Sequence, residues 1–328
     1  MDKLVAQFPK QIADAIEIAS RSDLSFFKNK TFSNVVICGM GGSGIGGKMV
    51  SQLFADQASL PIVLVQNYAI PAFVDENTLV IGSSYSGNTE ETLTAIKSAD
   101  EKGATIVGVS SGGELIEFCK NNNYDCIKLP GGNPPRSMLA FSAVQLIHIL
   151  SKAGVIDSNA IDTIAECRHL LNDELITIKM EAKKMAKHLF NKQCMFYTDA
   201  DLEFVAIRAR QQINENSKRL CWHHVIPEMN HNELVGWAGG DDSFAAVFFL
   251  SQFLNDRNLR RTELSQEIIG KRTPNVLTIN GKGKTLIEES FYFIHIIDWA
   301  SLFLADMIEI DPVEVKVIDY LKNTLDKV

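Results

Sequence analysis

Side-chain hydroxyls and one glycine crowd the segment 83–92, S-S-Y-S-G-N-T-E-E-T, directly after the apolar run 79–81. The run predicts a buried strand, and the periodic residues 89–102 predict a helix. The free N–H groups and the dipole at the start of a helix attract anions. Hydroxyl donors add to that attraction, and Gly87 lets the backbone close in on a ligand. The donors are Ser84, Ser86 and Thr89. This strand-to-helix turn therefore predicts an anion site.

A second interpretation of the same segment is an ordinary capped helix. Ser, Asn and Thr are common N-cap residues, and one or two of them satisfy the first turn of a helix. Four Ser and Thr hydroxyls in the seven residues 83–89 exceed that need. We therefore favour the anion site, with helix capping as the alternative.

A glycine-rich turn, G-M-G-G-S-G at 39–44, follows another apolar run and fits the pattern G-x-G-x-x-G. A dinucleotide site would also need an acidic residue at the end of the next strand. That strand ends at Gln66 and Asn67, so the dinucleotide interpretation fails. Since the carboxyl ends of parallel strands meet at one edge of a sheet, we expect Gly42 and Ser43 to face the hydroxyl-rich turn.

The segment 131–136, G-G-N-P-P-R, predicts a rigid loop that ends in the guanidinium of Arg136. An arginine fork donates two parallel hydrogen bonds, which suits a planar enediolate or carboxylate. A domain linker with a surface arginine is an equally simple interpretation of this segment.

Groups suited to proton transfer gather further along the chain. Glu215 stands near the end of the predicted helix 202–220. Three imidazoles follow within the segments 222–224, W-H-H, and 227–233, P-E-M-N-H-N-E. Carboxylates and imidazoles are general acids and bases near neutral pH. Their spacings match no familiar metal-ligand set, so we expect no metal here.

Composition limits the class of protein. The chain has 328 residues, 46% of them hydrophobic and 22% charged, as in globular proteins long enough for two domains. Six cysteines without zinc-like spacing indicate reduced thiols and predict a cytoplasmic location, and neither a signal peptide nor a membrane span is expected. The net charge of −8 argues against nucleic-acid and anionic-membrane partners.

Eight apolar runs without polar alternation predict strands that are covered on both faces, hence parallel sheets in an α/β fold. The runs are 35–38, 62–65, 79–81, 105–107, 126–127, 194–197, 245–250 and 276–279. The predicted helices are 9–19, 89–102, 139–152, the helical stretch 155–192, 202–220, 259–269 and 286–307. We therefore predict two related α/β sandwich domains, residues 1–153 and 154–328. Only the first would hold an anion site, since the acidic T-D-A-D turn at 198–201 would repel phosphate.

Together, these segments resemble the bifunctional phosphoglucose/phosphomannose isomerases, members of the phosphoglucose isomerase superfamily of tandem sugar-isomerase (SIS) domains. The resemblance covers nearly the whole chain. The S-x-S-G-N-T turn is shared by all SIS domains, whereas the set of Arg136, Glu215 and His231 points to an isomerase.

The resemblance implies an activity and a role for each residue. Glucose 6-phosphate, and by the same chemistry mannose 6-phosphate, would be interconverted with fructose 6-phosphate through a cis-enediol, without cofactor or metal. Glu215 would be the proton-shuttling base, Arg136 would stabilise the intermediate, and His231 would open the ring. The phosphate would bind Gly42, Ser43, Ser84, Ser86 and Thr89.

The resemblance also implies a homodimer in which His231 reaches the active site of the neighbouring subunit. A lysine near the C-terminus would assist ring opening, with Lys322 the best match and Lys316 the alternative. The small apolar Val313 and Val315 would leave room beside C2 of the sugar, which favours use of both epimers. Two rival functions stay open, a non-catalytic SIS phosphosugar sensor and an aminosugar-phosphate isomerase.

Overall fold

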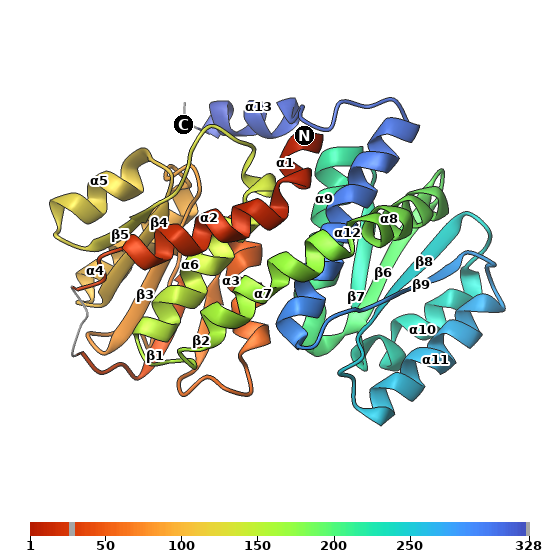
Figure 1. Ribbon diagram of the computed structural model, residues 1–328, viewed down its shortest axis with the longest axis horizontal. Helices are drawn as coiled ribbons and strands as arrows, with labels where there is room; N and C mark the ends of the chain where they lie inside the picture. Colours follow the sequence, from red (N-terminus) through yellow and green to blue (C-terminus); the bar gives the residue numbers. More distant parts are fainter. Residues whose placement is uncertain (26–29, 326–328) are drawn as a thin grey trace. The chain divides into compact units, whose positions relative to one another are not determined.

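The protein, seen in a computed structural model, is described here for residues 1–25 and 30–325 (Figure 1). It divides into two compact units, each built on one parallel sheet. The first-sheet unit comprises Ala6–Asp173 and Lys282–Tyr292, and the second-sheet unit comprises Met1–Val5, Glu174–Gly281 and Phe293–Val328. The predicted α/β class is confirmed, while the predicted domain boundary after residue 153 stays a prediction. None of the described helices is long and apolar enough to span a membrane.

The first sheet has the strand order β2-β1-β3-β4-β5, and every neighbouring pair is parallel. Its strands are β1 (Asn34–Cys38), β2 (Ile62–Val65), β3 (Thr78–Ser83), β4 (Thr105–Ser110) and β5 (Asp125–Lys128). Alternate residues such as Val36 and Val80 pack with the apolar faces of α4 (Glu90–Glu101) and α5 (Gly113–Asn121). Both faces are covered, which explains why the strands lack polar alternation.

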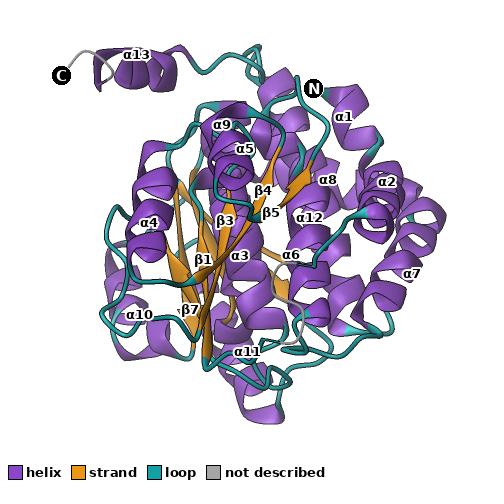
Figure 2. Ribbon diagram, turned by 90° about the vertical axis from the view of Figure 1, so that its left-hand side faces the viewer, coloured by secondary structure: helices purple, strands orange, loops and turns teal. Residues whose placement is uncertain are grey.

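Helices line both faces of this sheet. In Figure 2, α4 lies on one side of β1 and β3, and α3 and α6 lie on the other. The remaining helices of the unit are α2 (Phe8–Arg21), α3 (Gly41–Leu53), the 3₁₀-helix η1 (Pro135–Ser137), α6 (Leu139–Lys152) and α7 (Ala160–Asp173). Phe291, from the start of α12 (Leu286–Met307), stacks on Phe8 of α2 with ring centroids 5.8 Å apart.

Two helices of the first-sheet unit had no bounds in the sequence analysis. The glycine-rich turn at 39–44 is the beginning of α3, and α5 follows β4 in one of the helical stretches between strands. Glycine is a poor helix former, but in α3 it allows the helix to pack closely on the sheet. A Cβ at Gly47 would stand 2.7 Å from Leu64 and 3.0 Å from Ile37, so glycine lets α3 approach the sheet closely.

The second sheet has the order β7-β6-β8-β9, again with parallel neighbours. Its strands are β6 (Gln193–Asp199), β7 (Cys221–Ile226), β8 (Phe244–Leu250) and β9 (Val276–Asn280). Strand β7 was not predicted, because its histidines suggested a functional segment. His223 in fact faces Glu203, with the closest N and O atoms 3.6 Å apart, and Nδ1 of His224 accepts from the N–H of Val225.

A buried polar ladder fixes α9 against α12 within the second-sheet unit. Arg208 donates to both carboxylate oxygens of Asp298 at 3.0 and 2.9 Å, and Gln212 donates to the same carboxylate at 2.6 Å. One turn further, Asn216 donates to Ser301 at 2.9 Å. These residues recur every four positions, so they form one stripe along α9 and set its rotation.

The helices of this unit are α1 (Asp2–Ala6, up to Val5), α8 (Leu175–Leu189), η2 (Ala200–Leu202), α9 (Glu203–Ser217), η3 (Glu228–His231), α10 (Glu233–Gly236), η4 (Trp237–Gly239), α11 (Asp256–Gly270), α12 from Phe293, and α13 (Lys316–Leu325).

Candidate functional site

Tyr85 stands directly after β3 and joins three other loops at the carboxyl edge of the first sheet. Its backbone N–H donates to the hydroxyl of Ser43 in α3 at 3.1 Å. Its carbonyl accepts from the Ser111 hydroxyl, after β4, at 2.6 Å. Its phenol donates to the carbonyl of Pro130 at 2.8 Å and accepts from the N–H of Asn133 at 3.3 Å. One residue therefore links the first turn of α3, which follows β1, to the loops after β3, β4 and β5.

The phenol of Tyr85 stays protonated in this position. The side chain is only 8% exposed, and its burial raises the pKa of Tyr85, while the hydrogen bond from Asn133 opposes that rise. A neutral phenol both donates and accepts, as the contacts to Pro130 and Asn133 require.

The turn after β3 closes on its own hydroxyls. The Ser84 hydroxyl accepts from the N–H of Gly87 at 3.1 Å and lies 2.8 Å from the hydroxyl of Thr89. Gly87 has φ +75°, and a Cβ there would stand 1.7 Å from the carbonyl oxygen of Gly112. A side chain at Gly87 would separate two neighbouring loops, so the close approach requires glycine.

The hydroxyls do not cap the following helix. Thr89 is the N-cap residue of α4, yet among the described residues its side chain bonds Ser84 and makes no cap hydrogen bond. Met40, the N-cap residue of α3, likewise provides no side-chain cap within the described part of the chain. Two helices thus begin at this edge without side-chain caps, which is what an anion site requires, although within the residues described α2 and α6 also begin without one.

Arg136 lies beside the same edge. It belongs to η1 and is 5% exposed, so the interpretation as a surface arginine in a linker is wrong. A Cβ at Gly42 would stand 3.1 Å from the carbonyl oxygen of Pro135 and 3.5 Å from the backbone N of Arg136. The loop that carries Arg136 therefore packs against the first turn of α3, next to Ser43.

The proposed base, Glu215, lies in the last turn of α9 in the second-sheet unit. Lys218 follows it with left-handed φ of 51° and ends the helix. The Lys218 ammonium donates to the carbonyl of Glu215 at 2.7 Å and to the carbonyl of Asp311 at 3.0 Å. This lysine therefore joins the end of α9 to the segment that precedes α13.

His231 is exposed at the end of η3, after the carboxyl end of β7. Its neighbour Asn230 anchors this short helix, because its amide donates to the Ser265 hydroxyl of α11 at 2.8 Å. Lys316 and Lys322 both belong to α13, whose described side chains are not buried. The choice of Lys322 as the C-terminal lysine stays a prediction.

No group of three or more His, Cys, Asp or Glu residues that could hold a metal ion occurs among residues 1–25 and 30–325.

Comparison with known proteins covers both units. The model of the SIS domain matches residues 30–124, and that of the bacterial phospho-glucose isomerase C-terminal SIS domain matches residues 178–325. A bifunctional phosphoglucose/phosphomannose isomerase from Caldicellulosiruptor bescii is 35% identical over 99% of this chain and 98% of its own. Another, from Aquifex aeolicus, is 31% identical over 90% of this chain and 91% of its own.

The chain belongs to the bifunctional phosphoglucose/phosphomannose isomerase family. A solved structure, the C-terminal domain of glucosamine-fructose-6-phosphate aminotransferase from Francisella tularensis, has the same fold with a TM-score of 0.77. It covers 95% of this chain and 97% of its own at 15% identity, so it supports the fold alone.

The structure groups part of the predicted site. In the first-sheet unit Ser43 bonds Tyr85, and Ser84 and Thr89 bond each other in the same turn. Ser86 is exposed and accepts from the N–H of Asn88 at 3.2 Å. The sequence analysis missed Tyr85, although it stands between two serines of the turn shared by SIS domains. The sequence did contain a signal for this role. Tyr85 is the one large side chain in a turn of small residues, and a side chain of that length can reach neighbouring loops.

We predict that Tyr85→Phe destabilises the loops at the carboxyl edge of the first sheet and leaves the sheet itself folded. Loss of the phenol oxygen removes the contacts to Pro130 and Asn133, so the free energy of unfolding should fall by about 1–3 kcal/mol. Hydrogen exchange at the Asn133 amide should accelerate. Tyr68→Phe is the matched control, since that ring is 42% exposed and its hydroxyl lies 3.5 Å from Glu90. Equal effects in the two variants would contradict the role of Tyr85.

Proposed function

We propose that the protein interconverts glucose 6-phosphate and mannose 6-phosphate with fructose 6-phosphate, as an aldose–ketose isomerase that works through a cis-enediol. The relationship over the full length of the chain supports this activity. The single structural observation that carries it is the buried Arg136 beside a hydroxyl-rich turn between two uncapped helix starts. A phosphate-only sensor would not need a buried guanidinium in addition to that turn.

The phosphate binds at the carboxyl edge of the first sheet in this proposal. Its ligands are Gly42, Ser43, Ser84, Ser86 and Thr89. One of the Ser84 and Thr89 hydroxyls donates to the other along their 2.8 Å contact, which leaves the proton of the accepting hydroxyl for a phosphate oxygen. Binding energy gained at this remote end of the sugar holds the reacting carbons in place.

The chemistry then needs only proton transfers. His231 and Lys322 move the protons that open the pyranose ring. Glu215 takes the proton from C2 and returns it to C1, and the C1 carbonyl oxygen becomes a hydroxyl as the C2 hydroxyl becomes the ketone. Arg136 donates to the enediolate, whose negative charge exists only between the two proton transfers. No step of this sequence calls for a metal or a cofactor.

We predict that Glu215→Gln abolishes most of the turnover. The amide keeps the shape of the side chain but cannot accept the C2 proton, so kcat should fall by about 10²–10⁴ with the thermal unfolding midpoint preserved. Glu267→Gln is a suitable control, because Glu267 is an exposed carboxylate paired with Lys271 at 2.9 Å on α11. Near-normal turnover in a folded Glu215→Gln variant would falsify the assignment.

Use of both epimers depends on the space beside C2. The segment 311–315 begins at Asp311, which shares the Lys218 ammonium with Glu215, and so starts close to the end of the proposed base's helix. Within it, Val313 and Val315 are small and apolar. In this proposal the two valines line the space beside C2 and place no amide there that could fix the open sugar by hydrogen bonds. The C1–C2 unit can then rotate, so Glu215 can reach the C2 proton of either epimer.

We therefore expect isomerisation of glucose 6-phosphate and of mannose 6-phosphate in one coupled assay for fructose 6-phosphate. A ratio of kcat/KM beyond about 10⁴ against mannose, or about 5.5 kcal/mol in the barrier, would contradict the bifunctional activity. Glucosamine 6-phosphate belongs in the same assay, because its preferred turnover would indicate an aminosugar-phosphate isomerase. Tight binding of sugar phosphate without turnover would indicate the sensor.

We also propose that the protein is a homodimer in which His231 completes the partner subunit's site. The exposure of His231 within its own unit is compatible with this arrangement. Each site would then take Glu215 from one subunit and His231 from the other.

The expected consequence is complementation between two inactive proteins. Mixing Glu215→Gln with His231→Ala under subunit exchange produces mixed dimers with one intact and one doubly altered site. About a quarter of the wild-type activity should return at an equal ratio, by random pairing in a two-fold dimer. In the control, each variant undergoes the same subunit exchange on its own and should stay inactive. Absence of any recovery, with exchange verified by mass spectrometry, would place both residues in one subunit.

A further inference from the structure

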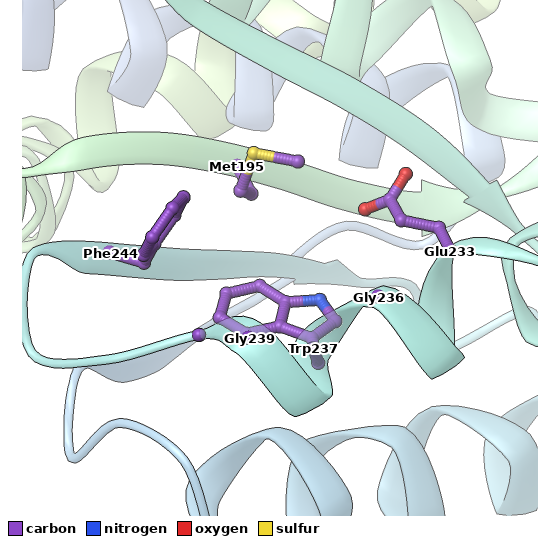
Figure 3. Close-up of a pocket in the computed structure, with 7 residues that line it drawn as sticks. Met195, Glu233, Gly236, Trp237, Gly239 and Phe244 are labelled. Carbon is purple, nitrogen blue, oxygen red and sulfur yellow. The ribbon is translucent and has the colours of Figure 1, made fainter.

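A pocket of about 230 Å³ lies on one face of the second sheet (Figure 3). Met195 and Phe244 project into it from β6 and β8, and Trp237 and Glu233 come from the segment that follows His231. In Figure 3 the three apolar side chains surround one space, with Phe244 and Glu233 at opposite ends. The rest of the wall is backbone at Gly236, Gly239 and Gly240.

The polar end of the pocket is a fixed chain of hydrogen bonds. The indole N–H of Trp237 donates to the phenol oxygen of Tyr197 at 2.9 Å, and the phenol donates to Oε1 of Glu233. Burial and the negative charge of Glu233 raise the pKa of Tyr197, so the phenol keeps its proton. The carboxylate is therefore the acceptor, and its Oε2 has no hydrogen-bond partner among the described residues.

The apolar end is an aromatic corner. The rings of Trp237 and Phe244 have centroids 5.9 Å apart and planes at 70°, so they form two adjoining walls. The faces of aromatic rings attract cations, and the sulfur of Met195 is polarizable and adapts to a ring or an alkyl group. A carboxylate stands opposite these walls, so the pocket offers an apolar chamber with one negative charge.

We propose that this pocket binds a small aromatic cation, an ammonium group carried on an aromatic ring. The ammonium would donate to Glu233, and the ring would lie against Trp237 and Phe244. The lining residues that the structure describes offer no basic side chain for the phosphate of a sugar phosphate, and Glu233 would repel it. The pocket is thus a second ligand site and not a subsite of the isomerase substrate.

Its position in the sheet supports a separate site. Phe244 is the first residue of β8, and Met195 lies near the amino end of β6. Catalytic groups of open parallel sheets lie at the opposite, carboxyl edge. Glu233 follows His231 by two residues, but its side chain turns inward to Tyr197, whereas His231 is exposed.

The test is titration of the full-length protein with 2-phenylethylammonium chloride and with its neutral counterpart, 2-phenylethanol, by calorimetry or protein-observed NMR. We expect saturable binding of the ammonium with Kd about 1 mM or tighter. The alcohol should bind about tenfold more weakly, because it lacks the charge-assisted hydrogen bond. N-acetyl-lysine methylamide, which carries the ammonium without a ring, should also bind more weakly. The comparison of these two ammonium compounds shows whether the ligand is a free aromatic amine or a lysine side chain of another protein.

Three variants locate the site. Glu233→Gln keeps an oxygen for Tyr197 but removes the charge, so the ammonium should lose about tenfold in affinity and its advantage over the alcohol. Phe244→Leu keeps an apolar wall but removes one ring face, so the affinity for the ammonium should fall about threefold or more. Glu263→Gln is the control, since that exposed carboxylate pairs with Arg260 on α11 at 2.8 Å and lies outside the pocket. It should leave both affinities unchanged.

Equal affinities for ammonium and alcohol, lysine amide binding as tightly as phenylethylammonium, or no saturable binding at 20 mM would each overturn the proposal. So would unchanged affinity in a folded Glu233→Gln protein. If that variant fails to fold, unchanged affinity in Phe244→Leu overturns it instead. Isomerase activity with sugar phosphates is measured separately, so failure here leaves the proposed function untouched.

Discussion

The candidate site depends on how four segments are held together at one edge of a parallel sheet. Tyr85 makes the hydrogen bonds that connect them. Its N–H, carbonyl and phenol each bond a different loop, at distances from 2.6 to 3.3 Å. Loops after parallel strands have no ladder between them, so side chains and turns must supply the connections. A ring that is buried at its base and polar at its tip can span that distance while staying fixed.

Glycine makes this closure possible at two places. At Gly87 the backbone meets the carbonyl of Gly112, and at Gly42 it meets the loop that carries Arg136. In both places a side chain would push apart the loops that Tyr85 joins. The glycines near the site therefore set distances between backbones, in addition to permitting unusual dihedral angles at Gly87.

Much of this could be predicted from the sequence, and the failures have physical reasons. Apolar runs gave eight of the strands because both faces of each sheet are covered, but β7 carries Trp222, His223 and His224 and so lacks that pattern. The start of α3 was interpreted as a turn because its glycines, which allow close packing, contradict helix propensity. The arrangement around Tyr85 could not be predicted, because hydrogen bonds such as that to Pro130 join residues 45 positions apart.

The protein carries a net charge of −8, yet the proposed substrate is an anion. Long-range attraction cannot explain its binding, because the overall field repels phosphate. In the proposed site, binding would instead rely on short-range donors: two helix starts without side-chain caps, hydroxyls that are already oriented, and one buried guanidinium. Such groups are fixed before the ligand arrives, so little reorganisation is needed when it binds. The same reasoning applies with opposite sign to the pocket at Glu233, where an oriented carboxylate and two ring faces favour a cation. The two proposed sites would thus hold ligands of opposite charge in one fold, because each ligand would be recognised by dipoles and charges within a few ångströms and not by the charge of the whole protein.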